Sequence, residues 1–123
     1  DVLVNEIAPR VHNSGHLTIE SCITSQFEQH IRAIYNLSLG NVNQILPSVM
    51  VNLVGENNHI GEAFYRNIDK AFDLDGVYPH LYGKKITKPY RKMGHITIMD
   101  KKLEKAISKA RILKNTIKII SIK

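Results

Sequence analysis

The sequence predicts an α+β protein, either one domain or the end of a larger one. Its 123 residues are 43% hydrophobic and 23% charged, a mixture typical of globular chains. Short apolar runs rich in β-branched residues predict strands, and three segments with apolar residues at helical spacing predict helices. The strands are too few and the helices too short for a doubly wound sheet, so we expect a smaller α+β arrangement.

The first part of the chain begins with Val2–Ile7, an apolar run that predicts a buried strand. Because a first strand needs neighbours with which to pair, this beginning indicates a fragment whose upstream part is missing. Residues 8–18 are rich in hydrogen-bonding groups and predict a loop. A helix is then expected to start at Ser25, where Glu28 completes a capping box. Its apolar face consists of Phe27, Ile31, Ile34 and Tyr35.

The rest of the chain predicts a compact unit of alternating strands and helices. Strands are expected over residues 48–54, 77–82, 94–99 and 116–122, and helices over residues 62–72 and 101–114. Asp100 can cap the second of these helices, whose predicted buried stripe is Leu103, Ala106, Ile107, Ala110 and Leu113. The composition shifts near residues 41–47, so we expect two units, residues 1–45 and 46–123.

Charge is distributed unevenly along the chain. Residues 1–83 carry four basic and nine acidic side chains, a net charge of −5, whereas residues 84–123 carry thirteen basic and two acidic side chains, a net charge of +11. This asymmetry suggests a nucleic-acid surface, a site for an anionic ligand, or simply a solvated face on a basic terminal helix. Tyr90 is the one aromatic residue of the basic region available for base stacking, which argues against nucleic-acid binding.

Several classes of protein are excluded by composition. Cys22 is the single cysteine, so an internal disulfide framework is impossible. No apolar stretch approaches the roughly 20 residues that a membrane-spanning helix needs. We also see no basic start followed by an apolar run, as a signal peptide would have. The simplest expectation is a cytoplasmic protein that does not bind a membrane.

A cluster of polar side chains follows the first predicted strand. Glu6 lies at the strand end, where a carboxylate suits Mg²⁺, a cation that prefers oxygen ligands and shares them with phosphates. Arg10 could grip an oxyanion with two hydrogen bonds. Asn13 and Ser14, with the backbone around Gly15, could complete a polar cradle. The alternative is a loop whose polar groups only bond to one another.

His12 and His16 lie four residues apart, a spacing that invites a zinc hypothesis. That spacing brings two side chains together only on a helix, and Pro9, Asn13 and Gly15 argue against a helix here. With no cysteine nearby, structural zinc is the weaker interpretation.

A second cluster lies in the basic loop over residues 83–92. Five basic residues lie in this segment. Lysine offers phosphate a point charge, and arginine offers it a planar fork of hydrogen-bond donors. The alternative is an exposed basic hairpin. The loop is not a Walker loop, because the glycine-rich segment ending in Gly-Lys-Ser/Thr is absent.

Five segments together resemble one family of ATP-grasp enzymes, the 5-(carboxyamino)imidazole ribonucleotide synthetases of purine biosynthesis. The segments are residues 5–16, 24–33, 47–53, 82–84 and 91–96, and they occur in the family's order over essentially the whole chain. The neighbouring formate-dependent glycinamide ribonucleotide transformylases lack the Asn-Ser-Gly-His and Lys-Met-Gly-His forms. The resemblance implies that residues 1–45 end an ATP-grasp domain and that residues 46–123 form a small C-terminal α+β domain.

The resemblance also implies a reaction and its residues. In this family ATP and bicarbonate give carboxyphosphate, which carboxylates the amino group of 5-aminoimidazole ribonucleotide. By this likeness, Glu6 is a Mg²⁺ ligand, and Arg10 and His12 are catalytic, with Arg10 stabilising bicarbonate or carboxyphosphate. Substrate would be bound by Asn13, Ser14, His16, Lys84 and Arg91, the last two clamping the ribonucleotide 5′-phosphate. ATP and small-molecule substrates are the implied partners, in a full-length homodimer.

Three departures from family patterns qualify this expectation. Ala8 stands where many ATP-grasp enzymes place a metal-binding asparagine, although this family's own motif has alanine. Tyr90 stands where the family usually has glycine. The family enzyme is also far longer, so Glu6 alone would hold Mg²⁺ weakly, and we expect this C-terminal third to be inactive by itself. The two alternatives are a nucleic-acid module using residues 101–123 and an interaction domain using the edge of the strand over residues 116–122.

Overall fold

The computed structural model describes residues 2–122 and divides the chain into two compact units. The first unit is Asp1–Ile45 and the second is Leu46–Lys123. The α+β class is confirmed, with helices and strands both present. None of the helices formed by residues 2–122 has the length and apolar character that crossing a membrane requires.

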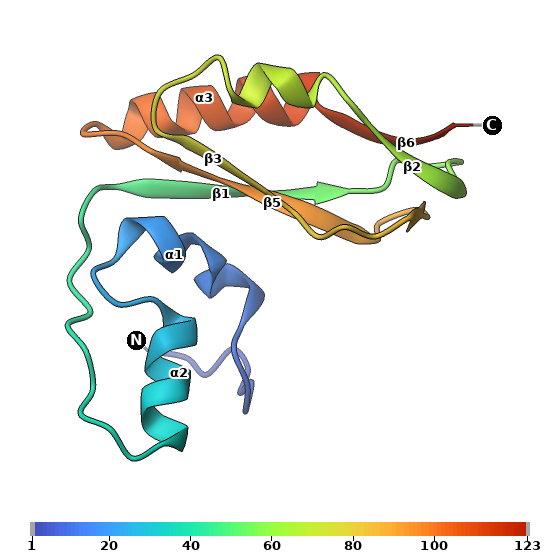
Figure 1. Ribbon diagram of the computed structural model, residues 1–123. Helices are drawn as coiled ribbons and strands as arrows, with labels where there is room; N and C mark the ends of the chain where they lie inside the picture. The colour runs from blue at the N-terminus through green and yellow to red at the C-terminus, as the bar shows by residue number, and fades with distance from the viewer. Residues whose placement is uncertain (1, 123) are drawn as a thin grey trace. The chain divides into compact units, whose positions relative to one another are not determined.

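The first unit contains three short helical segments, of which Figure 1 labels α1 and α2. They are a 3-10 helix, η1 (Asn13–Leu17), and the α-helices α1 (Thr18–Ser21) and α2 (Gln26–Ile34). The predicted start of α2 is confirmed, because the Glu28 N–H donates to Ser25 Oγ over 3.2 Å. The Glu28 carboxylate instead accepts from Arg32, one turn later. Ile31, Ile34 and Tyr35 of the predicted apolar face are exposed.

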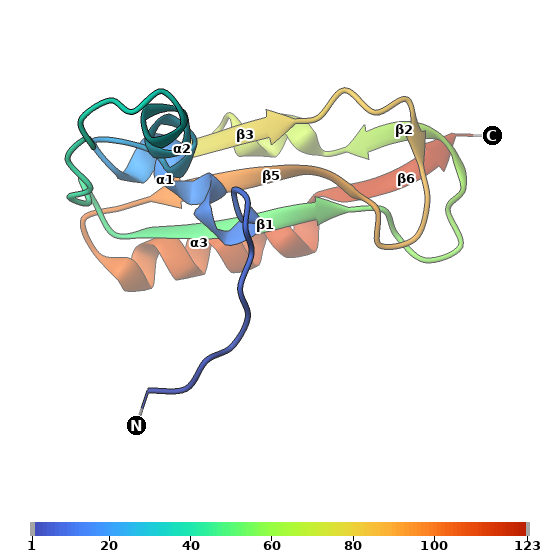
Figure 2. The same cartoon turned by 90° about the horizontal axis from the view of Figure 1, so that it is seen from below.

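Two predictions for the first unit are wrong. Val2–Ile7 is not a strand: it runs as a coil (Figure 2), and Val2, Leu3, Val4 and Ile7 are exposed. Strands gain stability from pairing, and no described residue pairs with this run. Residues 8–18 are not wholly loop either, because η1 forms after His12, whose side chain accepts from the Ser14 N–H.

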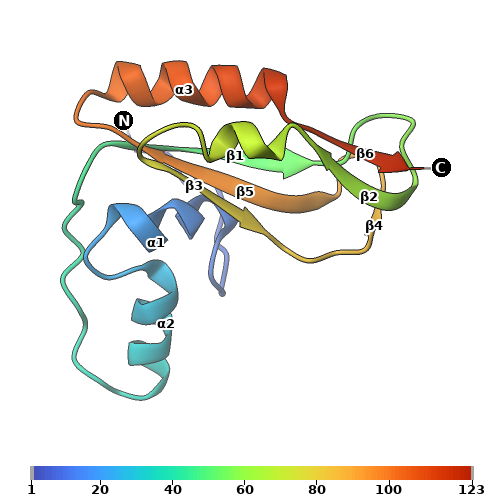
Figure 3. The same ribbon diagram turned by 45° about the horizontal axis from the view of Figure 1, so that its top comes forward.

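The second unit contains two three-stranded antiparallel sheets, seen in Figure 3. One has the order β1-β5-β3, with β1 (Ser48–Val54), β5 (Lys92–Met99) and β3 (Val77–Leu81). The other has the order β4-β2-β6, with β4 (Ile86–Thr87), β2 (Gly61–Arg66) and β6 (Lys118–Ile122). The predicted strands β1, β3, β5 and β6 are confirmed within two residues at each end.

The core lies between helix α3 (Leu103–Thr116) and one face of the β1-β5-β3 sheet, as Figure 1 shows. On the helix, Ala106, Ala110 and Leu113 are buried, whereas Leu103 of the predicted stripe is 44% exposed. Facing residues from the sheet are Val51, Leu53, Ile96 and Ile98. The helical spacing of the sequence therefore identified the centre of the core, whereas Leu103 lies outside it and Ile107 is only partly buried.

Asp100 fixes the chain just before α3, although the helix begins at Leu103 with Lys102 as its first flanking residue. Its carboxylate accepts from the Lys102 backbone N–H over 3.2 Å and pairs with Lys109 Nζ at 3.0 Å. These two contacts lower the pKa of Asp100 below its usual value, with the backbone hydrogen bond contributing most. The carboxylate therefore supports the segment before the helix, but Asp100 lies two residues before the N-cap position, so the predicted cap is wrong.

The predicted helix over residues 62–72 is wrong. Residues 61–66 form β2, in which inward and exposed side chains alternate, and a short 3-10 helix, η2 (Ile68–Ala71), follows. Strand pairing decides this outcome, because β2 lies between β4 and β6 and bonds to both. Asn67 then adopts a left-handed conformation with φ of 60°, which ends the strand. Tertiary pairing thus overrides the apolar spacing of Phe64, Ile68, Ala71 and Phe72.

Candidate active site

In the first unit, Glu6, His12 and Ser14 form a hydrogen-bonded chain. His12 Nε2 lies 2.8 Å from Glu6 Oε1, and His12 Nδ1 lies 2.8 Å from Ser14 Oγ. The Ser14 backbone N–H also points at Nδ1, over 3.3 Å. A backbone N–H can only donate, so Nδ1 acts as the acceptor and Nε2 carries the proton toward Glu6. The histidine thus orients the carboxylate that the sequence proposed as a metal ligand.

The Gln26 side chain holds the backbone of His12 in place. The His12 N–H donates to Gln26 Oε1 over 2.9 Å, and Gln26 Nε2 donates to the His12 carbonyl over 2.5 Å. Thr18 Oγ1 accepts from the Gln26 backbone N–H and donates to the Gly15 carbonyl. This network joins α2 to the turn that carries the site, so the capped start of α2 positions His12.

The other predicted site residues of the first unit are Arg10, Asn13 and His16, and their hydrogen bonds lie outside the Glu6–His12–Ser14 chain. Arg10 is exposed, and its Nη1 donates to the Val11 carbonyl over 2.9 Å. Asn13 contributes its carbonyl to His16 Nδ1 over 2.8 Å, and the His16 ring stands edge-on to Phe27. Within residues 2–122, no three His, Cys, Asp or Glu side chains come together as a set that could hold a metal ion.

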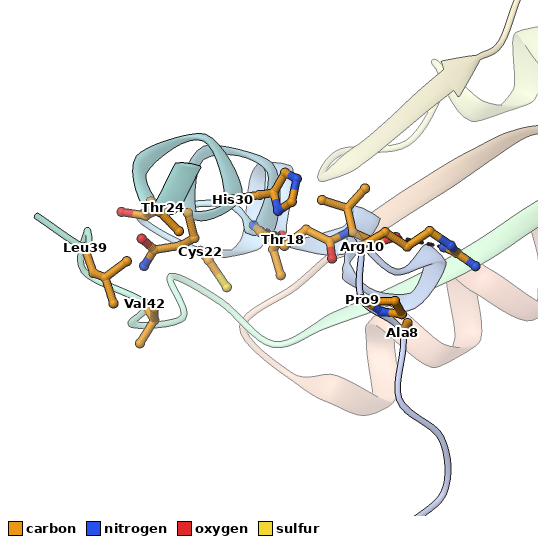
Figure 4. Close-up of a pocket in the computed structure, with 13 residues that line it drawn as sticks. Ala8, Pro9, Arg10, Thr18, Cys22, Thr24, His30, Leu39 and Val42 are labelled. Carbon is orange, nitrogen blue, oxygen red and sulfur yellow. Dashed lines mark hydrogen bonds between the residues drawn. The ribbon is translucent and has the colours of Figure 1, made fainter. Parts of the chain in front are cut away.

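A cavity of about 640 Å³ lies beside Arg10 in the first unit. Figure 4 shows it between the segment around Pro9 and Arg10 and the helix that carries His30, with Cys22 also at its wall. The volume falls within the range of small-molecule pockets. Glu6 and His12 do not line it, so the cavity and the Glu6–His12–Ser14 chain are adjacent features rather than one pocket.

In the second unit, Lys84 and Arg91 lie at the two ends of the basic loop. Lys84 Nζ donates to the Lys92 carbonyl over 2.7 Å, and Arg91 Nη1 donates to the Ile86 carbonyl over 2.9 Å. Both cations are held by neutral carbonyls, and neither forms an ion pair with a carboxylate within the described residues. Their charges are therefore available to an anion.

The loop differs from its predicted irregular form in two ways. Ile86 and Thr87 form strand β4, which pairs with β2. Tyr90 adopts φ of 61°, a conformation that favours glycine, and its N–H donates to the Gly55 carbonyl over 2.9 Å. A glycine at this position would adopt the same backbone without strain, which gives a physical reason for the glycine expected there.

Comparison with protein families identifies the chain. Residues 48–109 match the phosphoribosylaminoimidazole carboxylase C-terminal domain, which is just over half of the sequence, and residues 1–27 match the ATP-grasp domain. The chain belongs to the phosphoribosylaminoimidazole carboxylase C-terminal domain family. The resemblance predicted from the sequence is confirmed, and so is the fold, in which the end of an ATP-grasp domain precedes a small α+β domain.

One relative of this chain is the N5-carboxyaminoimidazole ribonucleotide synthase of Bacillus subtilis. It is 48% identical over 99 residues, covering 80% of this chain and 24% of the relative. The solved N5-carboxyaminoimidazole ribonucleotide synthetase of Thermotoga maritima is 53% identical with a TM-score of 0.96, covering 99% of this chain and 34% of that one. The chain thus spans about a quarter to a third of the proteins it matches.

A third similar protein carries ligands that bear on the site. The N5-carboxyaminoimidazole synthase of Aspergillus clavatus, solved in complex with ADP and 5-aminoimidazole ribonucleotide, is 34% identical with a TM-score of 0.74. The match covers 86% of this chain and 28% of that one. That protein therefore binds a nucleotide and a phosphorylated ribonucleotide.

The family member described here has site-supporting residues that sequence reasoning missed. Gln26, Thr18, Tyr82 and His95 all contact predicted site residues or one another, yet none was predicted to have a role. Gln26 lies fourteen residues from His12, and no spacing rule links the two positions. Only the close packing of Gly15 against the Gln26 amide reveals why a glycine occupies that position.

Replacing Gly15 with alanine is expected to destabilise the chain by about 0.5–1.5 kcal/mol, because the added methyl group would collide with the Gln26 amide and push it off its hydrogen bonds to the His12 backbone. Urea denaturation of Gly15→Ala, Gln26→Ala and the double variant measures this. Removing the amide also removes the collision, so the double variant should lose less stability than the sum of the two single changes. Strict additivity would show that the collision does not determine the effect.

Proposed function

We propose that the chain is the C-terminal part of an ATP-dependent carbon–nitrogen ligase. The ligase carboxylates the amino group of 5-aminoimidazole ribonucleotide with bicarbonate, through carboxyphosphate, and releases ADP and phosphate. Its product, 5-carboxyaminoimidazole ribonucleotide, belongs to de novo purine biosynthesis. The observation that carries this proposal is the 53% sequence identity, over 99% of the chain, to a solved enzyme named for this product. The ADP and ribonucleotide bound to the Aspergillus clavatus relative support the same substrates here.

The proposed division of labour follows the two units. Residues 1–45 would complete an ATP-grasp domain, and residues 46–123 would form the small C-terminal domain. The compact units on either side of Ile45 support this boundary. The matches of residues 1–27 and 48–109 to two different families also support it.

Glu6 is the proposed Mg²⁺ ligand of this chain. A magnesium ion is usually held by one or two carboxylates together with phosphates and waters, so a single oriented carboxylate fits part of such a site. Bound there, the ion would neutralise phosphate charge during phosphoryl transfer. The contribution of His12 is to hold Glu6 Oε1 in a fixed place through its Nε2 proton, at 2.8 Å. Ser14 and Gln26 in turn fix the ring and backbone of His12.

Arg10 is the proposed stabiliser of bicarbonate and carboxyphosphate. Its guanidinium has five donors in a planar fork, and the described contacts use Nη1 alone, on the Val11 carbonyl. The remaining donors suit the two oxygens of a carboxylate or phosphate group. Since Arg10 lies two residues before His12 and borders a cavity of small-molecule size, it can reach an anion without disturbing the Glu6–His12–Ser14 chain.

Lys84 and Arg91 are the proposed clamp on the ribonucleotide 5′-phosphate, and Asn13, Ser14 and His16 are proposed to contact substrate. Two of the basic residues of α3 and β6 are already paired, Lys109 with Asp100 and Lys118 with Glu56. The Glu56 N–H also donates to the Ile119 carbonyl over 2.9 Å, and Gly55 forms a parallel bridge with Ile119, so this segment covers part of the β6 edge. These contacts favour the ligase over a nucleic-acid module or a β6-edge interaction domain.

The test compares the full-length protein that contains this chain with the 123-residue chain alone. ADP release is measured with ATP, Mg²⁺ and bicarbonate, with and without 5-aminoimidazole ribonucleotide. We expect ribonucleotide-dependent ADP release from the full-length protein and none from the chain alone, since the chain offers one carboxylate to the metal. Activity of the chain alone, or full-length turnover indifferent to the ribonucleotide, would contradict the proposal. We expect the full-length protein to be a cytoplasmic homodimer. Sedimentation of the full-length protein tests the dimer.

A further inference from the structure

A group of packed aromatic side chains borders the basic loop (residues 83–92) of the second unit. His80 on β3 and His95 on β5 face one another in register, and their rings stack with centroids 4.5 Å apart and planes within 11°. His95 is 2% exposed. Tyr82, directly after β3, places its hydroxyl 2.9 Å from His95 Nδ1. The Tyr82 N–H also donates to the Met93 carbonyl over 3.0 Å. Tyr82 is therefore held to β5 at both its backbone and the tip of its side chain.

The ring of Tyr82 lies next to the Lys84 ammonium. Lys84 Nζ is 5.5 Å from the ring centroid, within the range of a cation–π contact. The same Nζ donates to the Lys92 carbonyl over 2.7 Å. Gly83, between the two residues, has φ of 64°, a left-handed conformation that glycine adopts without strain. The ammonium is thus held between an aromatic face and a carbonyl.

Such an arrangement matters because lysine is a flexible side chain. A free lysine loses considerable rotamer freedom when it is fixed against a ligand. If the ammonium is already fixed, the binding of a phosphate costs less, which is the general advantage of preorganisation. Burial raises the pKa of the Tyr82 hydroxyl, so the hydroxyl stays protonated and the ring beside Lys84 carries no charge of its own.

We propose that Tyr82, anchored by His95, is a positioning residue that holds the Lys84 ammonium ready for the phosphate group of the substrate. The proposal rests on the proposed function, because it takes Lys84 to be part of the phosphate clamp. It adds two residues, Tyr82 and His95, that act through Lys84 rather than by touching substrate.

The test uses the full-length protein and two substitutions of Tyr82 that remove different parts of its side chain. Tyr82→Leu removes both ring and hydroxyl, and we expect it to raise KM for 5-aminoimidazole ribonucleotide about two- to fivefold, the contribution of a cation–π contact of this kind. The kcat and the KM for ATP should stay unchanged. Tyr82→Phe keeps the ring but loses the anchor, so its KM should lie between those of the wild type and Tyr82→Leu. The matched control is Tyr78→Leu on β3, 40% exposed and outside the clamp, which should change neither KM.

A double-mutant cycle separates positioning from simple stability. In the Lys84→Ala background Tyr82→Leu should have no further effect on KM, because nothing is left to position. An equal effect with and without Lys84 would overturn the proposal. Should Tyr82→Leu fail to fold by circular dichroism, Tyr82→Phe carries the same cycle.

Titration of the full-length protein with ribose 5-phosphate distinguishes this inference from the proposed function. Weaker binding by both Lys84→Ala and Tyr82→Leu supports the positioning role even if no carboxylation is found. Weaker binding by Lys84→Ala alone leaves the clamp standing and overturns the role of Tyr82. Unchanged binding by Lys84→Ala removes the clamp, and the positioning proposal with it.

Discussion

Replacing Arg10 with alanine is expected to lower kcat of the proposed full-length ligase by about 10²–10³-fold, the usual effect of removing one group that stabilises transition-state charge. The guanidinium makes a single described hydrogen bond, to the Val11 carbonyl, and is otherwise exposed. Its removal should therefore leave the local fold intact while depriving bicarbonate and carboxyphosphate of a planar, two-pronged partner. Steady-state ADP release at saturating ATP, bicarbonate and ribonucleotide measures the change.

Two further substitutions sharpen the Arg10 experiment. Arg10→Lys keeps the charge but loses the fork, so we expect it to recover only a small part of the lost kcat. Arg32→Ala is the matched control, because Arg32 makes a surface ion pair with Glu28 at 2.7 Å on α2 and has no proposed catalytic role. Full activity of Arg10→Ala, or an equal loss from Arg32→Ala, would remove Arg10 from the proposed mechanism.

The sequence predicted the elements whose pattern is decided locally or by one buried face. The start of α2 was readable because Ser25 lies three residues before Glu28 and its Oγ accepts from the Glu28 backbone N–H. The centre of α3 was readable because Ala106, Ala110 and Leu113 recur at helical spacing against a single sheet face. In both cases the interacting groups are neighbours in sequence, or share one periodicity.

The elements that failed depend on distant partners. Residues 61–66 became a strand because β6, more than fifty residues later, pairs with them, and no local pattern contains that information. Val2–Ile7 has strand-like composition but no partner among the described residues. Local propensity alone cannot decide whether a strand finds a neighbour.

The candidate site divides in the same way. Glu6, Arg10, His12, Lys84 and Arg91 were recognisable because their chemistry stands out in short polar segments. The residues that hold them did not stand out, because Gln26 and Tyr82 resemble ordinary helix and strand residues. Their roles depend on packing, such as the contact of Gln26 with the His12 backbone across fourteen residues. Charged site residues can therefore be recognised from the sequence more readily than the residues that hold them in position.

Replacing Ile98 with alanine is expected to reduce the free energy of unfolding by about 2–5 kcal/mol, the usual cost of emptying a fully buried branched side chain. Ile98 is fully buried on β5, the central strand of its sheet, with Val49 of β1 and Val77 of β3 as its register partners. The strands β1 and β3, with α3 packed in the same core, thus form the wall of the vacated space, and tightly packed walls collapse poorly. Urea denaturation of the chain, followed by circular dichroism, measures the loss.

The matched controls for Ile98 separate burial from residue type. Ile98→Val deletes one methylene and should cost about 0.5–1.5 kcal/mol. Ile112→Ala, on α3 with 56% of its surface exposed, should cost well under 1 kcal/mol, since surface changes rarely exceed 0.5 kcal/mol. His95 and Ile98 are an odd number of residues apart on β5, so they lie on opposite sheet faces. Ile98→Val should therefore leave KM for 5-aminoimidazole ribonucleotide unchanged in the full-length protein, and equal losses from Ile98→Ala and Ile112→Ala would contradict this account of the core.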